Sequence, residues 1–571
     1  MRKLHRILTV LSLTCIGAFL ITACSSQAPS TVAPAAPATT VPVTSSTASV
    51  GTAGTGQTPA TLAAPAAQPT AGGTLTIGLD QEPPTLDPGG SPSAITFYIT
   101  ASAAESLLFL TSDHQLKPWL ADSYIASADG KQFTFKLRHD VKFQDGTPFN
   151  AQAVKWNFDR IVDPKFKAGA SLATLAGYDN TAVVDDFTAT VSFKGAYAPF
   201  LTYAACPFLA MVSPTATQQQ GDAVNQKPVL TGPFKFDEYV AKDHATMSKW
   251  ADYNRQSPVS DHNGPAYLDK VIWKFIPEAS TRTTTLQSGE TQMIDIVNST
   301  PDLAKLKSSS DFVVSAKPWV GASRQLLINV TKAPTDDVKV RQAISYATDK
   351  DTIVNTLYSG LGQKSFAPIT AVTLDDPSLH SYYAYDQAKA KQLLDDDGWK
   401  AGSDGIRTKN GQRLEFVINT IDYGGGADPF AELFQGQMRQ VGMDVKIKSQ
   451  ARPPYYDDNY KCTTNGSTIF LRYGDPDALY SLFASANYGA NFNTSCLKDP
   501  SVDAALAQGR SEVDPAKRKA IYVDLEKKLL DMAVTVPIAD DISVFVSKSN
   551  VTGLKFDNFS YPFVGDVSIK K

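Results

Sequence analysis

The sequence predicts a mixed α/β protein in which helices cover β-sheets. The chain has 571 residues, of which 43% are hydrophobic and 19% charged, enough for several domain-sized units with a large core. Beyond the N-terminus, no run approaches the roughly 20 apolar residues that cross a bilayer. Segments with the two-residue period of a strand and segments with the period of a helix follow one another along most of the chain.

The expected strands are short runs in which polar and apolar residues alternate, or buried runs rich in Val, Ile and Leu. They cover residues 74–79, 133–138, 183–193, 270–276, 325–330, 414–418 and 445–447. The expected helices carry apolar residues on one side. They cover residues 151–161, 279–288, 338–347, 350–357, 386–394, 429–438 and 515–530.

The N-terminus has the pattern of an export signal. Arg2, Lys3 and Arg6 precede residues 7–20, which carry no charge and are too few to form a stable spanning helix. Ile-Thr-Ala-Cys at 21–24 resembles a bacterial lipobox, which predicts a lipoprotein signal peptide over 1–23 and acylation of Cys24. A plain signal peptide that happens to contain a cysteine is the alternative. Two or three acyl chains would anchor the protein stably to a membrane.

Residues 24–72 predict a disordered tether. After Cys24 the segment consists almost entirely of Ser, Thr, Ala, Pro, Val, Gly and Gln, without a charge or an aromatic ring. Such a sequence buries too little apolar surface to offset the entropy of ordering it. Random-coil scaling gives it a reach of roughly 40 Å, and the folded part is expected to begin near Gly73.

Charge and cysteine content limit the function classes. The net charge is −4, and loss of a leader with three cations and no acid leaves −7. This balance argues against nucleic-acid binding, which favours clustered basic residues. Cys206, Cys462 and Cys496 remain in the exported part, where disulfides are permitted. Cys462 and Cys496 could close a loop and leave Cys206 free, although the sequence leaves the pairing open.

Common catalytic and metal motifs are missing. The six histidines are scattered without His-Glu-x-x-His spacing, and no Gly-x-Ser-x-Gly occurs. Residues 360–365 lack the Gly-Lys pair of a phosphate loop, and residues 395–398 lack the spacing of an EF-hand. We therefore expect no enzymatic activity, no metal and no cofactor.

Several blocks carry a family resemblance. The chain has Pro-Thr-Leu-Asp-Pro at 84–88, Val-Lys-Phe-Gln-Asp-Gly-Thr-Pro-Phe-Asn-Ala at 141–151, Thr-Gly-Pro-Phe at 231–234 and Asp-Val-Lys-Val-Arg-Gln-Ala-Ile-Ser-Tyr-Ala at 337–347. With these blocks in order, the chain from Gly73 onward resembles the dipeptide- and oligopeptide-type solute-binding proteins of ABC importers, extracellular solute-binding family 5.

The resemblance implies a two-lobed periplasmic-binding-protein-like fold of class II type, with an extra subdomain in the first lobe. Ligand binds between the lobes, which close by hinge rotation. The implied first lobe consists of residues 73–112, 229–325 and 535–571, the inserted subdomain of 113–228, and the second lobe of 326–534.

The resemblance also implies a function and partners. It describes a monomeric, extracytoplasmic lipoprotein, anchored on the periplasmic side or cell surface, that binds peptides and delivers them to an ABC permease and its ATPase subunits. Alternatives are a non-peptide ligand on the same scaffold, such as an oligosaccharide, an opine or a metal chelate, and a lipid-anchored envelope enzyme. A sensor or chaperone on this scaffold is a further alternative.

Candidate ligand contacts come first from a loop expected over residues 86–98. A loop that leaves the carboxyl end of a strand meets ligand in open α/β sheets, although this one could equally be a surface turn rich in Pro and Gly. We expect Asn329 to satisfy backbone groups at the hinge, and retain it as a contact. The candidates in this region are Leu86, Pro88, Ser91, Ser93, Tyr98 and Asn329.

A second group of candidates lies at residues 470–475, namely Phe470, Arg472, Tyr473 and Asp475. Peptide-binding members of the family often carry, three residues before the acid of the Asp-Pro pair, another acid that contacts the peptide ammonium. This chain has Arg472 there. An arginine repels an ammonium and favours a carboxylate or phosphate through its planar fork. The alternative is that the register is shifted and Arg472 is a surface charge.

Overall fold

The computed structural model of the chain describes residues 69–570, apart from 92, 170, 297–299, 423–427 and 490–491. These residues belong to one compact unit, Ala67–Lys571. The predicted signal peptide 1–23, the lipidation site Cys24 and nearly all of the tether 24–72 lie outside the described residues.

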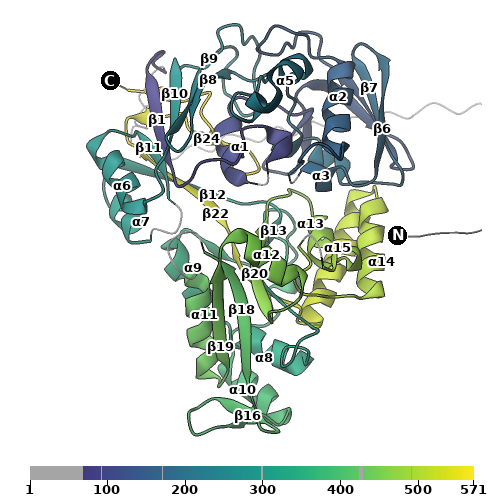
Figure 1. Cartoon of the computed structure of the whole chain (residues 1–571), viewed down its shortest axis with the longest axis vertical. Helices are drawn as coiled ribbons and strands as arrows, with labels where there is room; N and C mark the ends of the chain where they lie inside the picture. The colour runs from purple at the N-terminus through teal and green to yellow at the C-terminus, as the bar shows by residue number, and fades with distance from the viewer. Residues whose placement is uncertain are drawn as a thin grey trace, which may run out of the picture. The chain divides into compact units, whose positions relative to one another are not determined.

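Within the described residues, seven strands form a sheet in the order β12-β22-β11-β1-β10-β9-β8 (Figure 1). The central strand β1 is parallel to β10 and β11, and the other pairs are antiparallel. Leu75, Ile77 and Leu79 of β1 are fully buried, as the alternation of this segment predicts. The bounds are β1 Thr74–Leu79, β8 Phe234–Val240, β9 His244–Lys249, β10 Lys270–Phe275, β11 Met293–Asp295, β12 Phe312–Pro318 and β22 Ile542–Lys548.

Helices α6 (Ala279–Ser288) and α7 (Thr300–Lys307) pack against one end of this sheet. Their buried leucines contact Ile294 of β11 and Val546 of β22 in one apolar cluster. The sequence predicts α6 with the same bounds.

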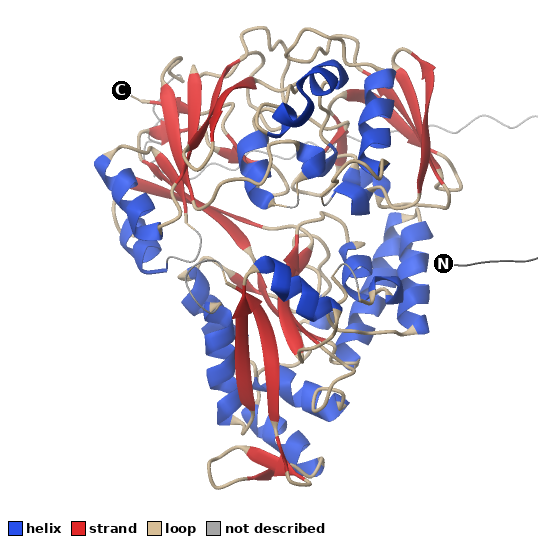
Figure 2. Cartoon of the chain, viewed as in Figure 1, coloured by secondary structure: helices blue, strands red, loops and turns tan. Residues whose placement is uncertain are grey.

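A second sheet has six strands among the residues described, in the order β14-β21-β13-β20-β18-β19. Strand β18 is parallel to β19 and β20, whereas β13 is antiparallel to β20 and β21. Helices α8 to α12 surround it (Figure 2). The strands are β13 Ala322–Ile328, β14 Gln363–Lys364, β18 Glu415–Ile421, β19 Asp444–Gln450, β20 Gly466–Leu471 and β21 Thr535–Asp540, and the helices α8 Val338–Ala347, α9 Lys350–Tyr358, α10 Gln387–Asp396, α11 Pro429–Gln440 and α12 Arg452–Tyr460.

The segment predicted as an inserted subdomain contains an antiparallel sheet of order β4-β5-β7-β6, counted over the described residues. Helix α2 lies on this sheet, and the side chain of Asn150 accepts a hydrogen bond from the backbone N–H of Ala153 at its start. The elements are β4 Ala121–Ala126, β5 Gln132–Leu137, β6 Tyr178–Asp185, β7 Thr188–Phe193, α2 Ala151–Val162, α3 Ser171–Thr174, α4 Phe200–Tyr203 and α5 Pro214–Gln220.

Three helices, α13, α14 and α15, lie between the six-stranded sheet and the four-stranded sheet (Figure 1). Their bounds are α13 Ala478–Phe483, α14 Pro500–Ser511 and α15 Pro515–Asp531. Smaller elements are β2 Leu108–Leu110, β3 Leu116–Pro118, β15 Lys400–Ala401, β16 Arg407–Lys409, β17 Gln412–Arg413, β23 Val551–Thr552, β24 Lys555–Phe556, β25 Pro562–Phe563 and β26 Ser568–Ile569, with 3-10 turns at Pro88–Gly90, Pro207–Leu209, Gly221–Asn225, Pro377–Leu379 and Ser485–Asn487.

The chain passes between the two large sheets twice, from β12 to β13 and from β21 to β22. These crossings lie at 318–322 and 540–542, a few residues from the lobe boundaries that the sequence predicts at 325/326 and 534/535. Strand β13 already pairs with β20 and β21 from Ala322 onward, and β21 stays in the six-stranded sheet to Asp540.

The expected loop over residues 86–98 is wrong in its second half. Residues Ala94–Thr100 form helix α1, in which every residue from Ile95 to Thr100 is buried. Apart from Ala94, the segment consists of β-branched and aromatic residues with low helix propensity, and burial overrides that preference. The hydroxyl of Thr96 donates to the carbonyl of Thr85 (2.6 Å) and fixes the helix against the preceding turn.

Candidate ligand-binding site at the sheet junction

The first crossing segment brings Trp319 and Gly321 against the end of β20. The backbone N–H of Trp319 donates to the carbonyl of Asp541 (2.7 Å), which ties the two crossings together. Gly321 has φ +107°, and a Cβ there would lie 2.3 Å from the carbonyl oxygen of Leu471. The close approach of the crossing to β20 therefore requires glycine.

Arg472 follows β20 and points its side chain into this junction. It is only 6% exposed. Its Nη2 donates to the hydroxyl of Tyr98 (3.1 Å), and its guanidinium stacks over the Trp319 ring, 3.2 Å from the centroid. The rings of Tyr98 and Tyr561 lie 5.5 and 5.2 Å away.

Two hydroxyl groups, one from α1 and one from the seven-stranded sheet, complete this cluster. The indole N–H of Trp319 donates to Oγ of Ser543 (3.0 Å), and the hydroxyls of Ser543 and Tyr98 lie 3.3 Å apart. Tyr98 belongs to α1 and Ser543 to β22 of the seven-stranded sheet, whereas Arg472 directly follows β20 of the six-stranded sheet. We call Tyr98, Trp319, Arg472 and Ser543 the junction cluster. Its residues lie in or next to both large sheets.

A second charged group lies beside it. Nε of Arg324 donates to Oδ1 of Asp541 (2.9 Å), and Nη1 donates to Oδ2 of Asp428 (3.5 Å). The hydroxyl of Tyr358 also donates to Asp541. Burial is the largest single effect on the pKa of Arg324 and would lower it, but Asp541, Tyr358 and Asp428 together outweigh burial, and the net shift is strongly upward. Arg324 is thus a neutralised cation.

Aromatic rings separate the two arginines. The guanidinium of Arg324 lies 4.9 Å from the Phe470 ring centroid, and Phe470 meets Trp319 edge to face at 5.2 Å. The junction therefore offers one neutralised cation, one cation without an ion-pair partner in the described chain, and aromatic surface between them.

Of the residues predicted from the sequence, the structure brings Tyr98, Phe470 and Arg472 together at this junction. Tyr473 instead packs its ring against Phe208 and Tyr203, at centroid distances of 6.0 and 6.4 Å. It is 5% exposed, so its role in the structure is core packing.

The amide of Asn329 satisfies backbone groups, as expected from the sequence. Its Nδ2 donates to the carbonyls of Thr464 (2.8 Å) and Cys462 (3.2 Å), and its Oδ1 accepts from the N–H of Thr331 (2.8 Å). These bonds hold the chain after β13 against the chain before β20.

The remaining N-terminal candidates hold the turn before α1. Leu86 is fully buried, and Pro88 opens a buried 3-10 turn. Oγ of Ser91 donates to Oγ1 of Thr96 (2.7 Å), and Ser93 precedes α1 without a side-chain cap. These contacts shape the support of Tyr98 rather than the junction itself.

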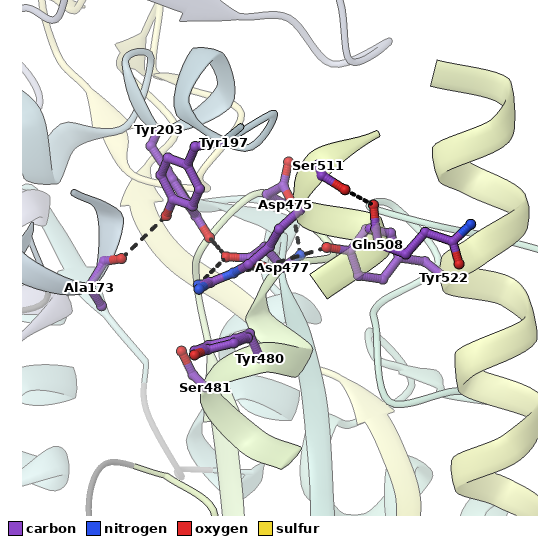
Figure 3. Close-up of polar contacts among 12 residues, drawn as sticks. Ala173, Tyr197, Tyr203, Asp475, Asp477, Tyr480, Ser481, Gln508, Ser511 and Tyr522 are labelled. Carbon is purple, nitrogen blue, oxygen red and sulfur yellow. Dashed lines mark hydrogen bonds and ion pairs between the residues drawn. The ribbon is translucent and has the colours of Figure 1, made fainter. Parts of the chain in front are cut away.

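Asp475 and Asp477 form buried ion pairs with two helices (Figure 3). Arg518 of α15 contacts Asp475 at 2.6 and 2.9 Å, and Arg510 of α14 contacts Asp477 at 2.7 and 2.8 Å. Burial raises the pKa of Asp477, and Arg510 opposes that shift. Because both Asp475 oxygens bind Arg518, its observed role is to fix the segment after Arg472.

The disulfide considered for Cys462 and Cys496 is present in the structure, with their Cα atoms 6.2 Å apart. It joins the chain before β20 to the chain before α14. Cys206 is a buried free thiol. Burial raises the pKa of this thiol strongly, so it is held neutral.

Sequence reasoning missed Trp319, Arg324, Asp541 and Ser543. Each crossing interrupts two neighbouring strands of the sequence. Pro318 marks the first interruption, and the pair Asp540-Asp541 marks the second. These two interruptions are the sequence signal that could have pointed to the missed residues. Among the described residues, no group of three or more His, Cys, Asp or Glu side chains could hold a metal ion.

Comparison with known proteins assigns the chain to a family. The model of the bacterial extracellular solute-binding proteins, family 5, matches residues 115–491, about two thirds of the chain. The chain belongs to family 5 of the bacterial extracellular solute-binding proteins. This solute-binding protein is therefore extracytoplasmic and not an enzyme, and the resemblance seen in the sequence is confirmed. No helix in the described part of the chain has the length and hydrophobicity of a membrane span.

Known relatives and solved structures are similar to this chain over most of its length. The glutathione-binding protein GsiB of Pectobacterium atrosepticum is 29% identical over 479 residues, covering 82% of this solute-binding protein and 89% of GsiB. NikA from Brucella suis in complex with Fe(III)-EDTA superposes with a TM-score of 0.77 at 25% identity, covering 87% of this chain and 100% of NikA. DppA from Helicobacter pylori in complex with the peptide STSA gives 0.73 at 24% identity, covering 88% and 99%. The two-lobed periplasmic-binding-protein fold is thereby confirmed.

Proposed function

We propose that this protein captures a small peptide or a glutathione-like ligand between its two lobes and delivers it to an ABC permease and its ATPase. The observation that carries the proposal is the family match over residues 115–491. GsiB, a relative at 29% identity, binds glutathione by its name. The junction cluster supports the same site, because its groups come from both lobes and ligand there would favour the closed arrangement.

The proposed lobe division keeps the insert at 113–228 and places the hinge at the two crossings, 318–322 and 540–542. A peptide offers charged ends and backbone N–H and C=O groups. Arginine side chains, hydroxyls and strand edges at the junction can satisfy these groups. Candidate contacts are Tyr98, Trp319, Arg324, Phe470, Arg472 and Ser543.

The test is calorimetric titration of the purified monomer with glutathione and with di-, tri- and tetrapeptides. We expect saturable binding, recovery of the ligand unchanged, and a smaller radius of gyration by X-ray scattering on closure. Binding of oligosaccharides, opines or metal chelates, with no binding of peptides or glutathione, would show that the ligand class is wrong although solute binding stands. Consumption of the ligand would contradict the transport role.

We further propose that Cys24 is acylated and that residues 24–72 tether the binding domain to the membrane. In cells grown with a labelled fatty acid, the wild-type protein should carry the label in the membrane fraction. Cys24→Ala should lose the label, whereas Cys15→Ala, a matched change within the leader, should keep it. Equal labelling of the two variants would contradict the anchor.

A further inference from the structure

Arg472 differs from the other buried arginines in the described part of the chain. Arg255, Arg282 and Arg407 pair with Glu105, Asp295 and Asp395. Arg341 has no ion pair there but donates to the carbonyls of Thr335, Asp336 and Met532. In Arg472, Nε and Nη1 are buried without a hydrogen-bond partner, and the side chain forms no ion pair with any described carboxylate.

The surroundings of Arg472 stabilise its charge only in part. Trp319, Tyr98 and Tyr561 present rings to the guanidinium, and stacking uses its faces. The N–H groups lie in the guanidinium plane, so a ring stacked on its face does not accept them. A buried charge that lacks its hydrogen bonds is costly. The side chain thus keeps an unsatisfied edge of the shape that matches a planar carboxylate.

Asp557, whose pKa Arg472 lowers, does not accept hydrogen bonds from the free N–H groups of Arg472. Its Oδ1 accepts the backbone N–H of Tyr561 (2.8 Å). Burial raises the pKa of Asp557 to about 7, against the opposing effects of the Tyr561 and Phe559 N–H groups, Arg472 and Lys317. At neutral pH this carboxyl therefore supplies only part of a countercharge, and it makes no ion pair with Arg472 in the described chain.

The hydroxyls of Tyr98 and Ser543, which belong to the first lobe, lie next to the Arg472 guanidinium of the second lobe. Tyr98 accepts from Nη2 of Arg472, and Ser543 lies 3.3 Å from the Tyr98 hydroxyl. A carboxylate bound to Arg472 can accept from hydroxyls of the opposite lobe as well. Such an anion would hold the two lobes together.

We propose that Arg472 receives a carboxylate of the ligand, so that the protein selects anionic solutes over their amides and over ligands with only a positive end. This inference rests on the proposed function, because it names the ligand group that the junction recognises. Nearby Arg324 does not provide an equivalent site, because Asp541 and Asp428 already neutralise it.

The binding test uses the full chain, dialysed free of co-purified solute, with glutathione, a free tripeptide and the same tripeptide as its C-terminal amide and as its N-acetyl derivative. Wild type should bind the free or the N-acetylated tripeptide, which keep the C-terminal carboxylate, about 10- to 100-fold more tightly than the C-terminal amide, which lacks it. Arg472→Met should lose this preference, and Arg472→Lys should keep part of it. A preference unchanged in Arg472→Met would overturn the inference and leave peptide binding intact.

Thermal unfolding without ligand supplies a second readout that does not depend on the choice of solute. Arg472→Met removes an uncompensated buried charge, so its melting temperature should equal or exceed that of wild type. Arg518→Met, the matched change at a paired arginine, strands Asp475 and should melt several degrees lower. If neither peptide nor glutathione binds, the proposed function fails. In that case citrate, a small carboxylate, serves as the probe in the same melting experiment. The inference stands if citrate stabilises wild type and only the Arg472 variants lose this stabilisation. It fails as well if Arg472→Met melts as low as Arg518→Met.

Discussion

The hydroxyl of Tyr203 donates to Oδ2 of Asp477 over 3.3 Å, although the two residues are 274 positions apart. Tyr203 ends α4, in the segment with the four-stranded sheet, and Asp477 precedes α13 in the proposed second lobe (Figure 3). The N–H of Ala198 donates to the carbonyl of Arg510 at the same place (2.8 Å). The contact therefore joins the proposed insert to helices that follow the junction cluster, and it should form when the lobes close.

Tyr203→Phe should weaken ligand binding about 3- to 10-fold, because it removes one hydrogen bond of ordinary strength from the closed state. Calorimetry with one bound solute measures this change. Tyr197→Phe is the matched control, since the Tyr197 hydroxyl donates to the carbonyl of Ala173 (3.4 Å) within the same segment. Equal affinities of Tyr203→Phe and Tyr197→Phe would show that the contact does not form on closure. The same conclusion would follow if Tyr203→Phe lost as much free energy of unfolding without ligand as it lost in binding free energy.

The sequence predicts the regular elements well where one period dominates. Strand β1 and helix α6 occur at the expected bounds, because alternation and helical spacing of apolar residues reflect burial directly. Helix α1 could not be predicted, because its β-branched and aromatic residues are helical only through burial against the turn at Thr85.

The candidate site is predictable in part. The chemistry of Arg472 follows from its place before Asp475-Pro476, but its partners do not. Tyr98 lies 374 positions away, and Trp319 and Ser543 come from the two separate crossings. Contacts of this kind depend on the packing of one lobe against the other, which no local pattern contains.

Gly321→Ala should destabilise the protein more than its backbone conformation alone explains. A Cβ at this position would meet the Leu471 carbonyl oxygen at 2.3 Å and the Tyr473 nitrogen at 2.7 Å. Gly146 is the matched control, because it also has positive φ, +84°, and a Cβ added there would meet nothing within 4 Å. We expect a loss of about 1–2 kcal/mol for Gly146→Ala and a clearly larger loss for Gly321→Ala, measured by urea unfolding. Equal losses would mean that the crossing can move away from β20.

Removal of the disulfide should destabilise the protein. Cys462 and Cys496 are separated by 34 positions, and closing a loop of that length stabilises a fold by about 3–4 kcal/mol in the chain-entropy model. The double variant Cys462→Ser/Cys496→Ser should therefore unfold at lower denaturant, and dithiothreitol should lower wild type to a similar value. The same reductant on the double variant is the control. A further fall there would assign the effect to another group.

Two buried acids predict how stability depends on pH. Burial raises the pKa of Asp540 to about 6 and that of Asp557 to about 7, from a usual value of 3.8, with backbone N–H groups opposing both shifts. Between pH 4 and pH 7 these two carboxyls therefore hold more protons in the folded chain than in the unfolded chain. The contribution of these two groups to the free energy of unfolding falls as the pH rises through this window, by about 1.4 kcal/mol per unit of pKa shift for each group.

Asp540→Asn and Asp557→Asn should make this fall shallower, because the amide cannot ionise yet keeps an oxygen for the N–H of Ala371 or Tyr561. Urea unfolding at half-unit steps from pH 4.5 to pH 7.5 measures the slope. Asp269→Asn is the control. Hydrogen bonds from Lys249 and Gly73 lower the pKa of that exposed carboxyl, so it titrates below the window and its removal should leave the slope unchanged. A wild-type slope that persists in both test variants would mean that Asp540 and Asp557 are already ionised in the folded protein across this range.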